Sequence, residues 1–364
     1  MFKINPKGFE LVDRIVDSCA RYGIYTILDL HTAPGGHNQD WHSDSGIHKA
    51  LFWDFKVFQD VILNLWAELA KHYKDNQWVA GYNPLNEPAV GDHSKLVDYY
   101  HQLEKTIRAV DENHILFLDG NTYAADFRQF PKPVWPNTVY SIHDYTLFGF
   151  PGQGPDYEGK PEQFAKLKSS YERKIEYMKQ NNVPVWNGEF GPVYASQFRG
   201  DADADSINKV RYHVLKDQLK IYQKGDPSGD GAPILWSIWL WKDIGYQDST
   251  RFLVTGCTRK RALGLDRWGN DIDPKYGKLY DDLLAHFKDN VPEKYHKALY
   301  PSTWTMKDYI SRVARDMLFS QYAQEEYADL YANLSFEDLD ELAACFKFEN
   351  CIKRDELNAA LRDY

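Results

Sequence analysis

The sequence has little cysteine, no long apolar run and no excess of positive charge. Its four cysteines, Cys19, Cys257, Cys345 and Cys351, lack zinc-like spacing with histidine and are too few for a disulfide scaffold in 364 residues. Reduced, buried thiols are therefore the expected state, which favours the cytoplasm. The formal net charge of -10 argues against nucleic acid or an anionic membrane as the main partner.

The start of the chain lacks a secretion signal, because no apolar segment follows Met1-Phe2-Lys3. No run in the sequence is long enough to span a bilayer. As it stands, the sequence therefore predicts a cytoplasmic protein with no membrane partner. No feature of the sequence indicates an obligate protein partner.

Strand-like apolar segments alternate with amphipathic helical segments along most of the chain. The expected strands are residues 24–31, 79–87, 115–118, 138–143, 183–189 and 233–241. The expected helices are residues 6–22, 55–73, 94–110, 162–181, 206–222 and 276–289. Strands that alternate with helices predict an α/β fold with a parallel sheet.

Such strands can form a barrel or a doubly wound sheet. No Gly-rich phosphate-binding loop follows any of them. Polar residues instead end several strands, as in Asp29–His31 and Asn86–Glu87, which favours a barrel because its sites are built from many strand ends. From about Thr305 the chain is charged and helical. We therefore expect a barrel domain over residues 1–295 and a helical extension, 296–364, packed on it.

Two glutamates at predicted strand ends are candidates for glycoside hydrolysis. They are Glu87 in Leu85-Asn86-Glu87-Pro88 and Glu189 in Gly188-Glu189-Phe190. In a retaining glycosidase one carboxyl group protonates the leaving oxygen and the other attacks the anomeric carbon. Either motif alone is a weak signal, because a strand-end glutamate often has a structural role such as capping a helix.

The motifs taken in order make a stronger case. The chain resembles glycoside hydrolase family 5, a family of retaining (β/α)8 barrels, over about residues 5–245. The loop after His31 is most similar to the exo-β-glucanase and β-glucosidase branch. The matching motifs are Asp29-Leu30-His31 with Ala33-Pro34-Gly35, Asn86-Glu87-Pro88, His143-Asp144-Tyr145, Gly188-Glu189-Phe190 and Trp239-Leu240-Trp241-Lys242.

The resemblance implies a role for each matching residue. Glu87 is the general acid/base and Glu189 is the nucleophile. His31 and Asn86 bind hydroxyl groups of the sugar being cleaved. His143 lies beside the acid/base, Tyr145 hydrogen-bonds the nucleophile, and Trp239 forms an aromatic floor.

The resemblance implies a carbohydrate substrate and no cofactor. The loop 32–48 is rich in histidine and aspartate, so a metal site is conceivable there. Sugar binding or stabilisation of the loop is the preferred interpretation of these residues. We therefore expect no metal.

One departure from the family concerns the first strands. The first recognisable strand matches the third strand of the family, and the family's sugar-binding arginine at the end of strand two has no counterpart. The expected fold is thus a (β/α)8 TIM-barrel type truncated at its N-terminus to six βα units, with a C-terminal helical appendix. Either the sequence is a truncated or misassembled gene product, or the barrel is completed in another way. Secretion stays open, because the natural N-terminus can be missing.

The sequence therefore predicts a retaining β-glycoside hydrolase. It would cleave O-glycosyl bonds of β-glucosides or β-glucan ends by double displacement. An endo-β-glucanase or mannanase is the alternative within this class of enzyme. A catalytically impaired carbohydrate-binding relic is the alternative outside it, because of the missing strands.

Overall fold

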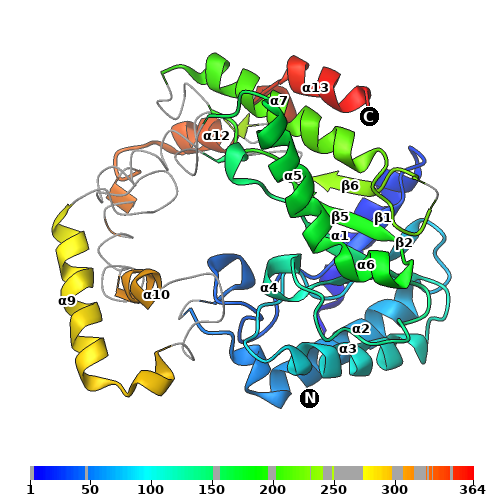
Figure 1. Cartoon of the computed structure of the whole chain (residues 1–364). Helices are drawn as coiled ribbons and strands as arrows, with labels where there is room; N and C mark the ends of the chain where they lie inside the picture. Colours follow the sequence, from blue (N-terminus) through cyan, green and yellow to red (C-terminus); the bar gives the residue numbers. More distant parts are fainter. Residues whose placement is uncertain are drawn as a thin grey trace. The chain divides into compact units, whose positions relative to one another are not determined.

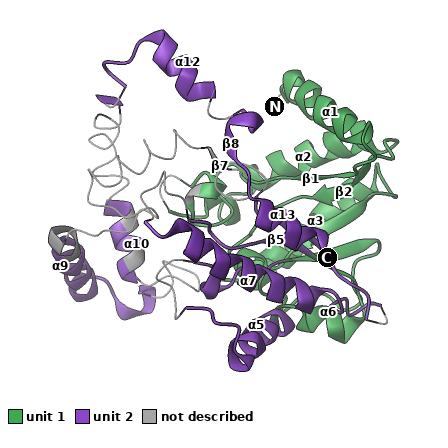
Figure 2. Cartoon of the chain, turned by 90° about the horizontal axis from the view of Figure 1, so that it is seen from above, with its two compact units in different colours: residues 1–142, 174–186, 298–304 green, residues 143–173, 187–297, 305–364 purple. Residues whose placement is uncertain are grey.

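The computed structural model (Figure 1) describes most of the chain in two compact units. The first unit holds the described residues up to Ile142 together with Lys174–Trp186, and the second holds His143–Arg173 and the described residues from Asn187 on (Figure 2). The described residues are 4–45, 48–150, 156–195, 202–229, 231–240, 248–249, 274–296, 306–314, 325, 328–329, 331–344 and 347–364.

Six strands form one sheet in which the order of the strands follows the order of the sequence. The first four pair in parallel, and the order continues through the fifth and the sixth. This arrangement confirms the predicted succession of six strand–helix units. The strands are β1 (Thr26–Asp29), β2 (Val79–Asn83), β3 (Ile115–Asp119), β4 (Thr138–His143), β5 (Val185–Phe190) and β6 (Leu235–Ile238).

Helices lie between the strands at the predicted places. In the first unit they are α1 (Pro6–Ala20), α2 (Lys56–Tyr73), α3 (His93–Arg108), α4 (Asn121–Ala124) and α6 (Glu176–Asn181). Of these, α4 after β3 is an additional helix that the sequence did not predict. Further helices are α5 (Pro161–Lys174), α7 (Ala204–Tyr222), α9 (Pro274–Asn290), α10 (Met306–Val313), α12 (Phe336–Ala344) and α13 (Asp355–Arg362). One-turn helices include η1 (Trp41–Ser43) and η2 (Leu51–Trp53).

The local sequence explains where α1 begins. The side chain of Asn5 accepts a hydrogen bond from the backbone N–H of Lys7, and Pro6 occupies the first turn, where no N–H is needed. The helix predicted over residues 162–181 is instead two helices that meet at Ile175. After this break the Tyr177 hydroxyl donates to the carbonyl of Pro131 at 2.8 Å.

The inner strands of the sheet are almost wholly buried, and aromatic rings fill much of the core. Trp66 of α2 donates its indole N–H to the carbonyl of Pro84 at 3.0 Å, directly after β2. The side chains of Trp66, Tyr82, Tyr100 and Tyr140 are each 1% exposed or less. Much of the chain's aromatic content therefore serves packing, as expected for rings that bury a large area each.

The described C-terminal segments are mainly helical, and α13 packs against α7. Leu357 and Ala360 on α13 are fully buried. A short antiparallel pair, β7 (Asp248–Ser249) and β8 (Cys351–Ile352), also joins distant parts of this unit. Among the described helices, none combines the length and apolar character needed to cross a membrane.

Asp111 lies in a buried hydrogen-bonded cluster in the turn before β3. Its carboxylate accepts from the Tyr82 hydroxyl at 2.7 Å and from His114 Nδ1 at 2.6 Å. The backbone N–H groups of Asn113 and His114 bind its other oxygen. Burial alone would raise the pKa of Asp111, but the hydrogen bonds from Tyr82 and these backbone groups outweigh it and lower that pKa.

We expect Asp111→Asn to reduce the free energy of unfolding at neutral pH by about 1.5–3 kcal/mol, because a buried charge-assisted hydrogen-bond acceptor is lost. A depressed folded-state pKa stabilises the protein above the unfolded value of about 3.9, and this contribution disappears as the pH falls through the folded value. The difference in free energy of unfolding between wild type and variant should therefore disappear on acidification. Urea unfolding over a pH series measures it, with the exposed Asp98→Asn on α3 as control. A difference that stays constant down to strongly acidic pH would contradict this account.

Candidate active site

Glu87 lies in a tight turn that follows β2. Its φ angle is +49°, a left-handed conformation that is uncommon outside glycine. Its backbone N–H donates to Asp119 Oδ2 at 2.8 Å, while Asp119 Oδ1 accepts from Asn83 Nδ2 at 3.0 Å. The fully buried Asp119 thus fixes the turn from the β3 side. Backbone strain held in this way is characteristic of functional sites.

The loop after β1 holds the same turn from the opposite side. Asn38 Nδ2 donates to the carbonyl of Glu87 at 2.9 Å, and His37 Nε2 donates to the carbonyl of Asn86. The backbone N–H of Ala89 in turn donates to the carbonyl of His37 at 3.0 Å. Complete burial lowers the pKa of His37 to about 3, so its ring is neutral at ordinary pH. Polar side chains of this loop therefore stabilise the turn that carries Glu87.

The side chains around Glu87 come from three neighbouring segments. The Glu87 Oε2 atom is 2.9 Å from His42 Nε2, and the Glu87 side chain is 12% exposed. His31 donates from Nδ1 to Asp29 Oδ2 at 3.0 Å, and its Nε2 lies 3.4 Å from Asn86 Nδ2. The first unit thus brings together His31, Asn86 and Glu87, three of the residues singled out from the sequence.

Glu189 is the penultimate residue of β5, lies in the second unit and is 9% exposed. The Tyr145 hydroxyl donates to Glu189 Oε2 at 2.9 Å. His143 Nδ1 lies 3.6 Å from the same oxygen. The backbone N–H of Asp144 donates to the Glu189 carbonyl at 3.0 Å. The second unit therefore gathers the His143–Tyr145 motif around Glu189.

Buried groups behind Glu189 fix this arrangement. Asp144 is 4% exposed and accepts from the Tyr222 hydroxyl of α7 at 2.6 Å. Gln218, also on α7, donates to the Asp144 carbonyl at 2.7 Å. Burial, reinforced by the negative charge of Asp144, raises the pKa of Tyr222 well above its usual range, so its hydroxyl stays a donor. The helix α7 thereby positions the segment that contacts Glu189.

Trp239 follows β6, and its backbone N–H donates to the carbonyl of Phe190 at 2.8 Å. Its side chain is 37% exposed, so an aromatic surface faces solvent. Gly191 lies next to this contact with a φ of +131°, and a Cβ there would approach the Trp239 carbonyl oxygen at 3.3 Å. Glycine is therefore required for the close approach of these two segments.

The sequence did not single out all the residues that support these glutamates. The sequence analysis did not identify Asp119, which holds the Glu87 turn, or the contact between His42 and Glu87. A polar loop directly after a strand was the available signal, but it does not show which side chain reaches a glutamate. Trp41 belongs to the loop 32–48, and Trp241 belongs to the last of the family motifs. The side chains of both residues lie outside the described part of the structure.

Comparison with known proteins decides the family. A sequence model of the cellulase family, glycosyl hydrolase family 5, matches residues 1–239. The chain belongs to this family. It is 46% identical to a β-xylosidase of Phanerodontia chrysosporium, over 99% of this chain and 76% of that protein. It is 23% identical to endoglucanase C of Acetivibrio thermocellus, over 66% of this chain and 74% of the relative.

Solved structures agree on the fold of this family 5 glycosidase. The crystal structure of an endoglucanase from Thermotoga maritima matches with a TM-score of 0.52 at 21% identity. The match covers 69% of this chain and 76% of the endoglucanase. The fold is TIM-barrel-like, and the sheet described here supplies six strands of it. Membership of the family makes the chain a glycosidase, and the solved structures agree with the predicted type of barrel.

Proposed function

We propose that this glycosidase hydrolyses a β-glycoside with net retention, with Glu189 as nucleophile and Glu87 as general acid/base. The observation that carries the proposal is that Glu87 follows β2 and Glu189 is the penultimate residue of β5, two strands of the same sheet, and that each glutamate has a distinct set of partners. The carboxyl ends of parallel barrel strands form one catalytic face. The Tyr145 hydroxyl favours the charged form of Glu189, which a nucleophile needs.

The reaction would take place in two displacements. The Glu189 carboxylate attacks the anomeric carbon, the bond to the leaving oxygen breaks, and Glu87 gives that oxygen its proton. Water then loses a proton to Glu87 and attacks the same carbon, which frees Glu189. Two inversions restore the original β configuration.

The remaining residues of the motifs are proposed to bind the sugar. His31, held by Asp29, and Asn86 offer polar groups beside Glu87. His143 and Tyr145 lie around Glu189 and complete the polar contacts. The exposed ring of Trp239 offers a flat surface on which a sugar face can stack.

The proposed substrates are small β-glycosides or chain ends with a terminal glucose or xylose. The relative that is 46% identical is named a β-xylosidase. The exo-acting branch predicted from the loop after His31 fits such substrates. Glucose and xylose share three equatorial ring hydroxyls and differ only in the hydroxymethyl group at C5. An endo-acting β-glucanase is the second candidate, because a more distant relative is named an endoglucanase.

Turnover of nitrophenyl glycosides tests this proposal. We expect release of nitrophenol from the β-glucoside or the β-xyloside and none from the α-glucoside. A loss of viscosity in a soluble β-glucan, with little release of nitrophenol, would favour the endo-acting candidate. Binding of sugar without turnover of any substrate would identify a carbohydrate-binding relic.

We also propose that two strand–helix units complete the barrel upstream of α1. Among the described strands, β1 and β6 each have only one neighbour in the sheet. Leu235 in β6 is 71% exposed, and the side chains of β1 are half-buried or exposed. The strands between them are nearly all buried. Strands of a parallel barrel are normally covered on both faces.

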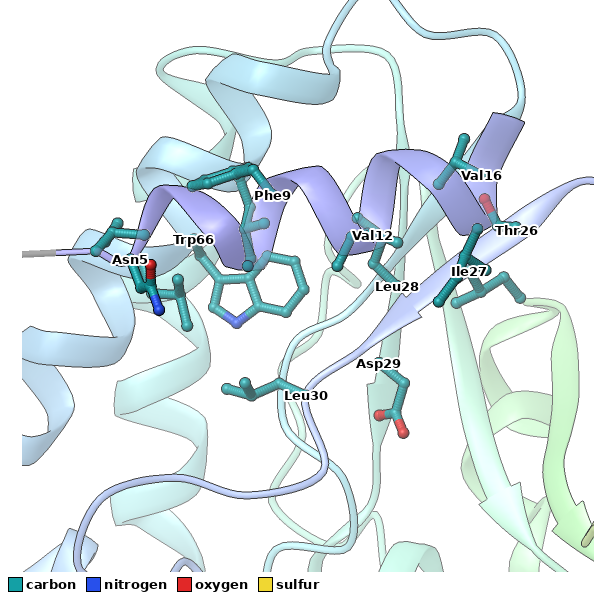
Figure 3. A pocket seen from close by; sticks show the side chains of 15 residues that line it. Asn5, Phe9, Val12, Val16, Thr26, Ile27, Leu28, Asp29, Leu30 and Trp66 are labelled. Carbon is teal, nitrogen blue, oxygen red and sulfur yellow. The ribbon is translucent and has the colours of Figure 1, made fainter. Parts of the chain in front are cut away.

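A cavity beside β1, in the first unit, supports the proposal that further strand–helix units pack there. It has a volume of about 400 Å³ and is lined by α1, by the residues of β1 and by α2. Figure 3 shows Phe9 and Val12 of α1 and the Trp66 ring of α2 around it. An apolar cavity along the free edge of a strand is where a further strand and its helix would pack.

We expect a longer chain, with two strand–helix units joined before Met1 and an arginine ending the second strand, to melt at a higher temperature. Each leucine-sized side chain buried in the cavity contributes about 1.5–3 kcal/mol, so two of them should raise the melting temperature by roughly 3–8 °C in a chain of this size. Turnover of the aryl glycoside should rise as well. Thermal melts and assays of both chains measure the effect.

The control for this experiment is the same upstream segment with serine at its two cavity-facing apolar positions. It should give a much smaller rise in melting temperature. Equal melting temperatures and equal turnover for the short and long chains would show that the sheet needs no further strands.

The division into a barrel over residues 1–295 and a helical extension over 296–364 remains our proposal. Pairing of β8 with β7 and packing of α13 on α7 support an extension that lies on elements of the second unit. Arg354, just before α13, lies over the Tyr194 ring at 4.8 Å. Such contacts are expected when a C-terminal segment packs on a barrel.

A further inference from the structure

His42 contacts the carboxyl group of Glu87 although none of the family motifs includes it. Its Nε2 atom is 2.9 Å from Glu87 Oε2, and the two side chains are 20% and 12% exposed. The one-turn helix η1 that carries His42 is anchored by Ser43, whose single hydroxyl proton is shared between the carbonyls of Asn38 at 2.9 Å and Asp40 at 3.0 Å. These hydrogen bonds anchor η1, the element that places the His42 ring beside the glutamate.

Asn38 decides which hydrogen-bonding role His42 Nε2 plays. The Asn38 Oδ1 atom accepts from the backbone N–H of Asp40 at 2.9 Å, and Nδ2 donates to the carbonyl of Glu87 at 2.9 Å. These two backbone partners assign the amide oxygen and nitrogen without ambiguity. Nδ2 is also 3.1 Å from His42 Nε2. Since an amide nitrogen only donates, His42 Nε2 accepts, and the ring proton is on Nδ1.

This tautomer favours one state of Glu87. The single lone pair of His42 Nε2 faces both Asn38 Nδ2 and Glu87 Oε2, which lies 2.9 Å away, so the carboxyl contact is favourable when Glu87 carries a proton that shares this lone pair. An ionised carboxylate would place two acceptors in contact. The arrangement of Asn38 and His42 therefore fits a protonated Glu87, which is the form that a general acid needs.

We propose that His42 is a positioning residue that keeps Glu87 protonated in the resting enzyme. The inference rests on the proposed role of Glu87 as general acid/base. Rotation of the carboxyl O–H turns the proton from His42 Nε2 to the glycosidic oxygen when substrate binds. After that proton has left, the lone pair of His42 faces a carboxylate, which favours uptake of a proton from the attacking water.

Other titratable groups surround this pair in the first unit. The His31 and Tyr123 rings lie with their centroids 6.2 and 6.3 Å from that of His42. The Asp119 carboxylate binds the backbone N–H of Glu87, and its negative charge also disfavours ionisation of the glutamate. His37 is neutral through burial.

The pH dependence of kcat/KM tests the proposal, with an aryl β-glycoside whose poor leaving group needs protonation. His42→Phe removes the acceptor, so Glu87 should lose its proton more easily. We expect the alkaline limb of the profile to move to lower pH by about one unit, the effect of one hydrogen bond. His42→Gln, which offers an amide oxygen, should move it less, and His101→Phe on the exposed face of α3 should not move it.

The opposite result overturns the proposal. A shift of the alkaline limb to higher pH would show that His42 is a cation that donates to an ionised Glu87. An unmoved limb would show that the ring only supports the loop. Glu87→Ala distinguishes a failure of the His42 role from a failure of the proposed function. If this variant leaves the alkaline limb in place, Glu87 is not the general acid and the proposed function itself fails.

A second measurement is independent of turnover. In protein with ¹³C-labelled glutamate carboxyl groups, the Glu87 signal is assigned by its loss in Glu87→Gln and then titrated. We expect Glu87 to ionise at a pH about one unit lower in His42→Phe than in wild type. An equal or higher midpoint in the variant would refute the role of His42.

Discussion

Glu189→Ala is expected to lose hydrolysis of an aryl β-glycoside by on the order of 10⁴-fold or more, the scale of effect when a covalent enzyme loses its nucleophile. The space left by the carboxylate should admit azide. Azide would attack the anomeric carbon opposite the leaving group in a single displacement, so the product should be an α-glycosyl azide. Initial rates with and without azide, and the anomeric configuration of the product, measure this prediction.

The matched control for this variant is Glu162→Ala, an exposed glutamate on α5 in the same unit. It should keep wild-type activity and show no response to azide. If Glu189→Ala retained full activity, or if azide gave only the β-glycosyl product, Glu189 would not be the nucleophile.

Glu87→Ala should produce a different pattern, because it removes proton transfer and leaves the nucleophile in place. We expect substrates with poor leaving groups to lose about 10²–10⁴-fold in kcat/KM, the usual contribution of general acid catalysis. Substrates with an activated nitrophenol should lose much less in this first step, because such a leaving group departs without protonation. A plot of rate against leaving-group pKa measures the difference.

Azide also distinguishes this variant. It should attack the glycosyl-enzyme intermediate in place of water and give a β-glycosyl azide, the configuration opposite to that expected for Glu189→Ala. Glu112→Ala, an exposed glutamate before β3, is the control and should behave as wild type. A uniform loss for good and poor leaving groups alike would argue against Glu87 as the acid.

The succession of strands and helices was predictable because buried strands and amphipathic helices leave strong periodic patterns. The ends of the strands were less predictable. Residues 79–87 read as one strand, but β2 ends at Asn83 because the chain then enters the turn held by Asp119 and Asn38. The break at Ile175 and the two-residue pair of β7 and β8 also left no periodic signal.

Single residues of the site could be named from the sequence where a motif lies at the end of a predicted strand, as for Glu87 and Glu189. The contacts of His42 could not, because they depend on how a loop of irregular backbone folds back over the next strand. Asp119 looked like any acidic residue at the end of an apolar strand. Its role depends on a hydrogen bond to a backbone group 32 residues earlier in the chain.

The configuration of the first-formed sugar tests the central claim most directly. Proton NMR can follow hydrolysis of an aryl β-glycoside from the first minutes, before the released sugar equilibrates between its two anomers. Double displacement by Glu189 and then water predicts that the β-anomer appears first and the α-anomer grows in later at the rate of mutarotation. If the α-anomer appears first, a single displacement has occurred, and neither the nucleophile nor the retaining mechanism proposed here is correct.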